Sequence, residues 1–283
     1  MRSIPPALFV VAIWTLPAIA QEGQPRQTAA EVLKKHGTAL AAVKMTVVHR
    51  TLVEKKEVHK EEHAVEVAGT VIRDDGTVVV AASSLDFLPT LPAGAPLPLE
   101  EITSEFKHEK PHIVLANGRE VPARMLGRDA GRDLAFFQPI EKPSPLHTIP
   151  SDNGKLPELA DEVIIVYPLS KSLQRKPAVA RRFVSAVINE MNPLAMLDTT
   201  QRQLGCPVFD THGRVLGIAA TVRPPQKPHE YLGNYENAEP DLVIRDMPTI
   251  KKSLAEIEKH PDGRGSTPGT CRSGPFRQTN RRG

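Results

Sequence analysis

The chain has 283 residues, of which 40% are hydrophobic and only 4% aromatic, and it carries 27 prolines. This length accommodates one large all-β domain or two small domains, and the many prolines predict frequent loops and turns. The formal net charge is +3, but residues 261–283 contribute +4 and leave the rest of the chain at −1. The basic charge therefore belongs to the C-terminal segment, and we expect no nucleic-acid-binding face on the folded domain.

The N-terminal segment predicts export. Arg2 supplies a short positive region, residues 7–16 are apolar, and Ala18-Ile19-Ala20 fits the small-x-small pattern of a cleavage site before Gln21. A membrane anchor is the alternative, but the apolar run is shorter than the ~20 residues that span a bilayer. We therefore expect a signal peptide at 1–20, a periplasmic or extracellular protein, and no membrane span after cleavage.

The first elements are a helix followed by short strands. Residues 28–42 predict a helix, because Val32, Leu33, His36 and Leu40 recur at helical spacing. Three strands are predicted next, at 43–49, 58–72 and 77–82, with Asp74-Asp75-Gly76 as a hairpin turn. Residues 86–112 contain five prolines and predict a long Pro-rich insertion, with one helical turn at 100–106.

Short strands resume after the insertion. They are predicted at 112–116, 120–126, 134–139, 163–167, 181–188, Val208 and 215–222, with turns at 117–118 and 210–213. A helix at 250–259 closes the domain, and residues 261–283 have the composition of a disordered basic tail. Many short strands with regularly spaced turns favour an all-β sandwich or barrel.

Three segments, at 69–84, 117–135 and 183–218, resemble in order the trypsin-like serine proteases of the HtrA/Deg group. Gly127-Arg128-Asp129 followed by Asp133-Leu134-Ala135 is the most specific part of the resemblance. It spans roughly residues 40–258. It implies an all-β, trypsin-like double β-barrel of Greek-key type over 28–260, with a short N-terminal and a C-terminal helix. A PDZ domain usually follows the barrels in this group; here only the tail follows, so none is expected.

The resemblance also implies where a catalytic triad would lie. Asp133 matches the carboxylate, whereas Ser83 falls on the histidine position and Leu204 on the nucleophilic serine. Arg202 replaces the glycine of the oxyanion turn, and Gly205 keeps the glycine after the nucleophile. Leucine has no nucleophilic atom, and a serine hydroxyl cannot act as a general base near neutral pH. The catalytic triad is therefore not intact, because only its carboxylate, Asp133, is kept. We predict a pseudoprotease that binds a peptide or protein partner.

Two other functions stay open from the sequence. One is an active serine endopeptidase with an unrecognised triad, in which Ser83, Ser84 or Cys206 would supply the nucleophile. The other is a structural assembly module. The alternating charges of residues 54–63 predict a solvated hairpin or an interaction surface. The Pro-rich insertion is either a plain insertion or a cover for the cleft between the barrels.

The remaining histidines and cysteines give no cofactor or metal prediction. His59 and His63, like His108 and His112, are four residues apart, which on a helix could bind zinc. Their sequence context favours a hairpin and a strand, so solvated histidines are the preferred interpretation. Export would permit a disulfide between Cys206 and Cys271, but a buried apolar Cys206 is preferred.

Overall fold

The computed structural model describes residues 27–53, 56–85, 102–150, 155–188, 194–198, 201–222 and 241–260. The signal peptide expected at 1–20 and the basic tail expected at 261–283 lie outside the described residues. In the described part, no helix is long and apolar enough to cross a membrane.

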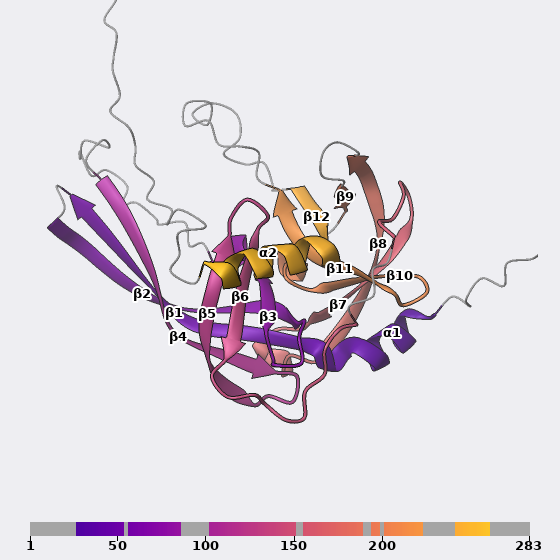
Figure 1. Ribbon diagram of the computed structural model, residues 1–283, viewed down its shortest axis with the longest axis horizontal. Coiled ribbons are helices and arrows are strands. Elements are labelled where there is room, and N and C mark those ends of the chain that lie inside the picture. Colours follow the sequence, from indigo (N-terminus) through magenta and orange to yellow (C-terminus); the bar gives the residue numbers. More distant parts are fainter. Residues whose placement is uncertain are drawn as a thin grey trace, which may run out of the picture.

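The N-terminal half is a closed antiparallel barrel in the order β1-β2-β3-β6-β5-β4, here called barrel 1 (Figure 1). Its strands are β1 (Leu40–Val53), β2 (Lys56–Val71), β3 (Val78–Ala81), β4 (Ile102–Leu115), β5 (Glu120–Asp129) and β6 (Leu134–Pro139). The turn at Gly76 and the turn at Gly118 both use positive φ, as their sequences predict.

The C-terminal half is a second closed antiparallel barrel, barrel 2, in the order β10-β11-β12-β9-β8-β7. Its strands are β7 (Glu162–Pro168), β8 (Pro177–Ile188), β9 (Leu194–Leu197), β10 (Pro207–Asp210), β11 (Val215–Val222) and β12 (Asp241–Asp246). The double β-barrel implied by the resemblance is thus confirmed. The alternation pattern missed β9 and β12, which are only four and six residues long.

The N-terminal helix is shorter than the sequence pattern predicts. Helix α1 covers only Ala29–His36, and the segment 37–42, expected to be helical, is a 3₁₀ turn followed by β1. Thr28 and Glu31 form a capping box at its start. From Leu40 onward the apolar residues pair with β2 instead of continuing the helix, so tertiary pairing overrides the helical periodicity.

The expectation of a loop with one helical turn over 86–112 is wrong from Ile102 onward. Strand β4 begins at Ile102 and pairs along β1 from Val53 inward. Pro111, which argued against a strand, lies where the β1–β4 register shifts, beside Lys110 with φ 51°. A register irregularity is where a strand tolerates proline. Residues 86–101 lie outside the described residues.

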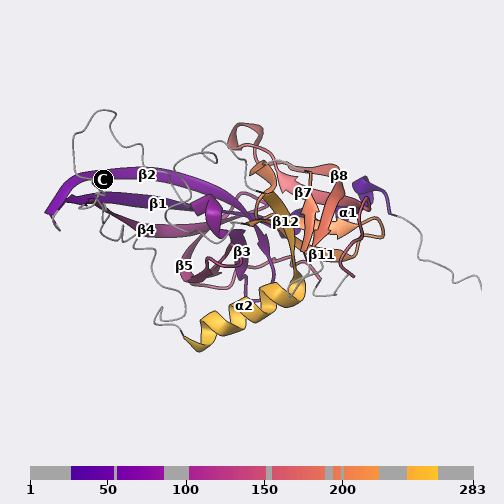
Figure 2. The same ribbon diagram turned by 90° about the horizontal axis from the view of Figure 1, so that it is seen from above.

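The distal parts of β1, β2 and β4, residues 46–53, 56–64 and 102–109, form a three-stranded sheet that we call the ribbon. It projects from barrel 1 away from barrel 2 (Figures 1 and 2). The predicted charged hairpin is therefore present, but β4 joins it as a third strand. Residues 102–109 of the Pro-rich insertion pair with β1 in the ribbon, so this part of the insertion does not cover the cleft between the barrels.

The interface between the barrels is mostly apolar and is closed by helix α2 (Met247–Lys259). Phe136 of β6 and Phe209 of β10 lie in one buried cluster with Met247 and Ile250 of α2. Although α2 follows barrel 2 in sequence, it packs across barrel 1 (Figure 2). Gly127 permits this approach, because a Cβ there would lie 2.6 Å from Ile257.

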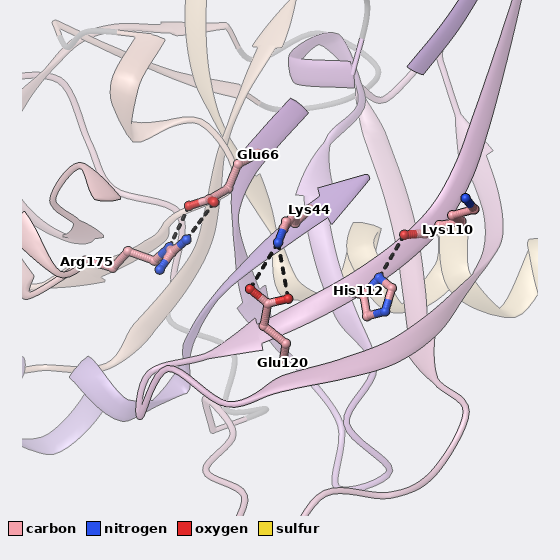
Figure 3. Close-up of polar contacts among 6 residues, drawn as sticks. All are labelled: Lys44, Glu66, Lys110, His112, Glu120 and Arg175. Carbon is pink, nitrogen blue, oxygen red and sulfur yellow. Dashed lines mark hydrogen bonds and ion pairs between the residues drawn. The ribbon is translucent and has the colours of Figure 1, made fainter. Parts of the chain in front are cut away.

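An ion pair also joins the barrels at the surface. Arg175, in the turn between β7 and β8, contacts the Glu66 carboxylate of β2 through Nε and a terminal nitrogen, at 2.5 and 2.7 Å (Figure 3). These hydrogen bonds lower the pKa of Glu66. The same view shows Lys44 bound to Glu120 and a ring nitrogen of His112 close to the carbonyl of Lys110.

His36 gives the junction of α1 with barrel 2 a testable pH dependence. Its ring is buried and stacks on Phe209 with centroids 4.6 Å apart. Burial, aided by the charge of Lys35, lowers its pKa to about 4, against 6.5 in a solvated side chain. As the pH falls below about 6.5, the unfolded chain binds a proton at this histidine while the folded chain does not. The free energy of unfolding therefore decreases as the pH is lowered through this range.

We expect the free energy of unfolding to drop by about 2 kcal/mol between about pH 7 and pH 5 from His36 alone. Urea unfolding of the native chain and of His36→Phe at both pH values measures this contribution. His260→Gln, at the exposed end of α2, is the control and should retain the full drop. An equal drop in His36→Phe and in the native chain would contradict the assignment.

Candidate functional site

The site is organised around Asp133, at the turn between β5 and β6, with φ 59° and 5% exposure. Its carboxylate accepts four hydrogen bonds. Ser83 donates its backbone N–H at 2.5 Å and its hydroxyl at 3.0 Å. Thr221 of β11 donates its N–H at 2.6 Å and its hydroxyl at 2.7 Å. Asp133 is thus a shared acceptor for a segment of barrel 1 and a strand of barrel 2.

Ser83 lies in a 3₁₀ turn, Ala82–Leu85, that follows β3 directly. The N–H of Ala82 donates to the carbonyl of Asp133 at 3.0 Å, which holds the turn against the β5–β6 loop. The structure therefore brings together two of the three residues that the sequence singled out, Ser83 and Asp133. In a catalytic triad, the histidine ring donates a hydrogen bond to this carboxylate. Here the Ser83 hydroxyl donates to it instead.

Leu204 follows the 3₁₀ turn Gln201–Gln203 and is 8% exposed. It belongs to the apolar core of barrel 2, in one cluster with Ala81 of β3 from barrel 1. Its segment therefore lies at the junction of the barrels, and Ala81 comes shortly before Ser83 in the sequence. A buried aliphatic side chain contributes to packing and offers no reactive atom.

Gly205 and Arg202 differ sharply in environment. Gly205 has φ 75°, donates to the carbonyl of Ala219 at 2.8 Å and accepts the Thr70 hydroxyl at 2.8 Å. A Cβ on Gly205 would overlap the carbonyl oxygen of Ala68. Arg202 is exposed. Gly205 is therefore a packing requirement of the barrel junction, whereas Arg202 faces solvent on the turn before Leu204.

Cys206 is poorly suited to act as a nucleophile. It is fully buried, and its Sγ lies 3.8 Å from the carbonyl of Leu204. Burial raises the pKa of its thiol strongly, which suppresses the thiolate needed for attack. The expectation of a buried, apolar Cys206 is confirmed. Cys271, its possible disulfide partner, lies outside the described residues.

Two residues of this site were not anticipated from the sequence. Thr221 is a lone polar residue near the end of the apolar strand β11, and that interruption is the available signal. Arg245 of β12 is 8% exposed and donates Nε to the carbonyl of Arg132 at 3.0 Å. Desolvation lowers its pKa, partly offset by the nearby charges of Asp133 and Asp129. No motif marks Arg245.

The histidine pairs lie on strands. His59 and His63 belong to β2, and His108 and His112 belong to β4. In the described part of the chain, no group of three His, Cys, Asp or Glu side chains could hold a metal ion. The four-residue spacing therefore does not create the helical zinc motif that it would suggest by itself.

Two six-stranded antiparallel barrels, with a buried aspartate at their junction, define a chymotrypsin-type double-barrel fold. A family model for the trypsin-like peptidase domain matches residues 27–218, and the chain belongs to that family. Among solved structures, the serine endoprotease from Yersinia pestis is similar with a TM-score of 0.53 and 16% identity, over 83% of this chain and 68% of that chain. That likeness shows the fold alone. A search of curated proteins gives no match.

Proposed function

We propose that this chain is an exported, catalytically inactive member of the trypsin-like peptidase family that binds a peptide or protein partner. The observation that carries the proposal is the hydrogen bonding of Asp133. Both carboxylate oxygens are occupied by Ser83 and Thr221. The position expected for the nucleophile holds the buried Leu204.

The chemistry of acyl transfer supports inactivity. The reaction needs a nucleophile, a general base to take its proton, and donors for the developing oxyanion. Ser83 is no general base near neutral pH. Loss of nucleophile or base typically costs several orders of magnitude in rate. The buried Cys206, with its raised pKa, offers no replacement.

A serine-hydrolase probe tests this part of the proposal. The chain from Gln21 onward, treated with a fluorophosphonate and separately with unfolded casein, should show neither labelling nor cleavage. Trypsin-treated samples serve as positive controls. Labelling or turnover that disappears in Ser83→Ala or Ser84→Ala would contradict inactivity and favour the alternative of an active endopeptidase with an unrecognised triad.

Peptide selection tests partner binding. Displayed random peptides should enrich on the immobilised chain, and the selected peptides should bind more weakly to Arg202→Glu, which reverses an exposed charge beside Leu204. Lys252→Glu, exposed on α2, is the matched control and should bind as the native chain does. Absence of any enrichment would favour a structural module.

N-terminal sequencing of the secreted chain tests export, with Gln21 as the expected first residue.

A further inference from the structure

One face of the ribbon is unusually rich in histidine. Residues directly opposite each other on paired strands point to the same face. The β1–β2 register sets Val47 opposite His63, His49 opposite Glu61, and Thr51 opposite His59. The β1–β4 register sets Val47 opposite His108. Four imidazoles and one carboxylate thus share a face: His49, His59, Glu61, His63 and His108.

This face is the outward continuation of the interior of barrel 1. Val43, Met45 and Val67 occupy the same face nearer the barrel and belong to its apolar core. Where the ribbon leaves the barrel, the apolar residues give way to histidines. His49 stays buried, at 3% exposure, although it lies beyond the barrel core.

Glu61 holds this cluster together. Its two carboxylate oxygens lie 2.8 Å from Nε2 of His59 and 3.0 Å from Nε2 of His63. Both contacts lower the pKa of Glu61, so it remains ionised. Burial lowers the pKa of His49, and the charges of His59 and His63 act in the same direction against the opposing effect of Glu61.

Several acidic side chains of the ribbon lie on the face opposite the histidines. Lys56, opposite Val53 at the tip, adds a positive charge to the histidine face. Glu57, Glu62 and Glu109 of the ribbon, and Glu66 at its base, face the opposite side by the same registers. Among the ribbon side chains that the structure describes, Glu61 is the carboxylate on the histidine face, and it contacts His59 and His63.

We propose that the histidine face is an acid-sensitive element that keeps the ribbon closed at neutral pH and opens it when the imidazoles protonate, with both barrels still folded. Histidine is the side chain that ordinarily changes charge between about pH 5 and pH 8. Positive charges added to one face of the ribbon repel one another, and Lys56 already lies on that face. Burial of His49 opposes its protonation in the closed ribbon, so acid favours the open ribbon.

The expected size is set mainly by His49, whose protonation the charges of His59 and His63 also oppose. A histidine with a pKa near 6.5 in the open ribbon and a lowered pKa in the closed one shifts the opening equilibrium by up to roughly tenfold between about pH 7.5 and pH 5.5. Hydrogen–deuterium exchange of the purified full chain, in the presence of EDTA, measures this shift as protection factors. Peptides that cover residues 45–53 and 56–66 should lose roughly tenfold in protection, after correction for the intrinsic pH dependence of exchange.

Variants assign the effect to this face. His49→Gln should reduce the loss to less than about threefold. The pair His59→Gln/His63→Gln, in which His59 is exposed and His63 is partly buried, should reduce it in part, because the charges of His59 and His63 lower the pKa of His49. His112→Gln is the matched control, because His112 lies on β4 opposite Lys44, on the other face (Figure 3). His36 is retained throughout, so its effect on the barrels is common to every variant.

The outcomes are distinct. An unchanged protection of the ribbon between the two pH values overturns the proposal. So does an equal loss in His59→Gln/His63→Gln and in the native chain, or a loss that only His112→Gln removes. A tenfold loss confined to the ribbon and reduced by the two histidine-face variants supports it.

Discussion

Replacing Asp133 by alanine will lower the free energy of unfolding by about 3 kcal/mol or more. The carboxylate accepts bonds from two backbone N–H groups and two hydroxyls, and the two bonds from Thr221 are buried. Alanine would leave these donors without an acceptor and would also have to adopt φ near 59°, a region that alanine disfavours. Urea unfolding at neutral pH, followed by circular dichroism, measures the loss.

Asp133→Asn separates the contribution of the carboxylate charge from that of the side-chain shape. Asp133→Asn keeps an acceptor oxygen and tolerates positive φ, so we expect roughly half of the alanine loss. Asp241→Ala, at the exposed start of β12, is the control and should change stability by less than about 0.5 kcal/mol. An Asp133→Ala protein as stable as the native one would contradict the structural role of this carboxylate.

Replacing Gly205 by alanine will be as damaging, with an expected loss of about 3 kcal/mol or more. The residue has φ 75°, and its Cβ would overlap the carbonyl oxygen of Ala68 and lie 3.2 Å from the amide nitrogen of Ala81. Both neighbours are backbone atoms of barrel 1, so the clash cannot be relieved by a rotamer change. The bond from Thr70 to the Gly205 carbonyl would be disturbed at the same time.

Gly118→Ala is a closely matched control for this prediction. Gly118 also has positive φ, 82°, but a Cβ there would meet nothing within 4 Å. Its loss should therefore be limited to the conformational cost of about 1 kcal/mol. The difference between the two variants, measured by the same urea unfolding, isolates the steric part. Similar losses for both would show that the close contact with Ala68 does not matter.

Much of the fold was predictable because local signals and strand pairing agree. Strand β6 has the predicted bounds, since its alternation directs Phe136 to the interface cluster and Phe137 into barrel 1. The predictions failed where long-range pairing decides. Residues 102–111 carry Pro111 and charged side chains, yet they form a strand because β1 offers a partner over that length.

The site was predictable only in part. The resemblance indicated Asp133 and Ser83, and the structure brings these residues into contact. It did not indicate Thr221 or Arg245, because a polar residue in an apolar strand becomes informative only when the opposite barrel is known. The histidine face of the ribbon was missed for the same reason, since its members come from three strands whose register is not encoded locally.

The position of α2 has a consequence for how the chain folds during synthesis. Barrel 1 is complete in sequence by residue 139, but the helix that packs across it ends only at Lys259. Because domains tend to fold as they leave the ribosome, barrel 1 must wait about a hundred further residues for its last covering element. Its apolar surface stays open to solvent and to chaperones in that interval. A stop codon before Met247 would therefore yield two barrels whose apolar interface cluster lacks the covering helix α2. We expect such a product to aggregate instead of accumulating as a shortened native protein.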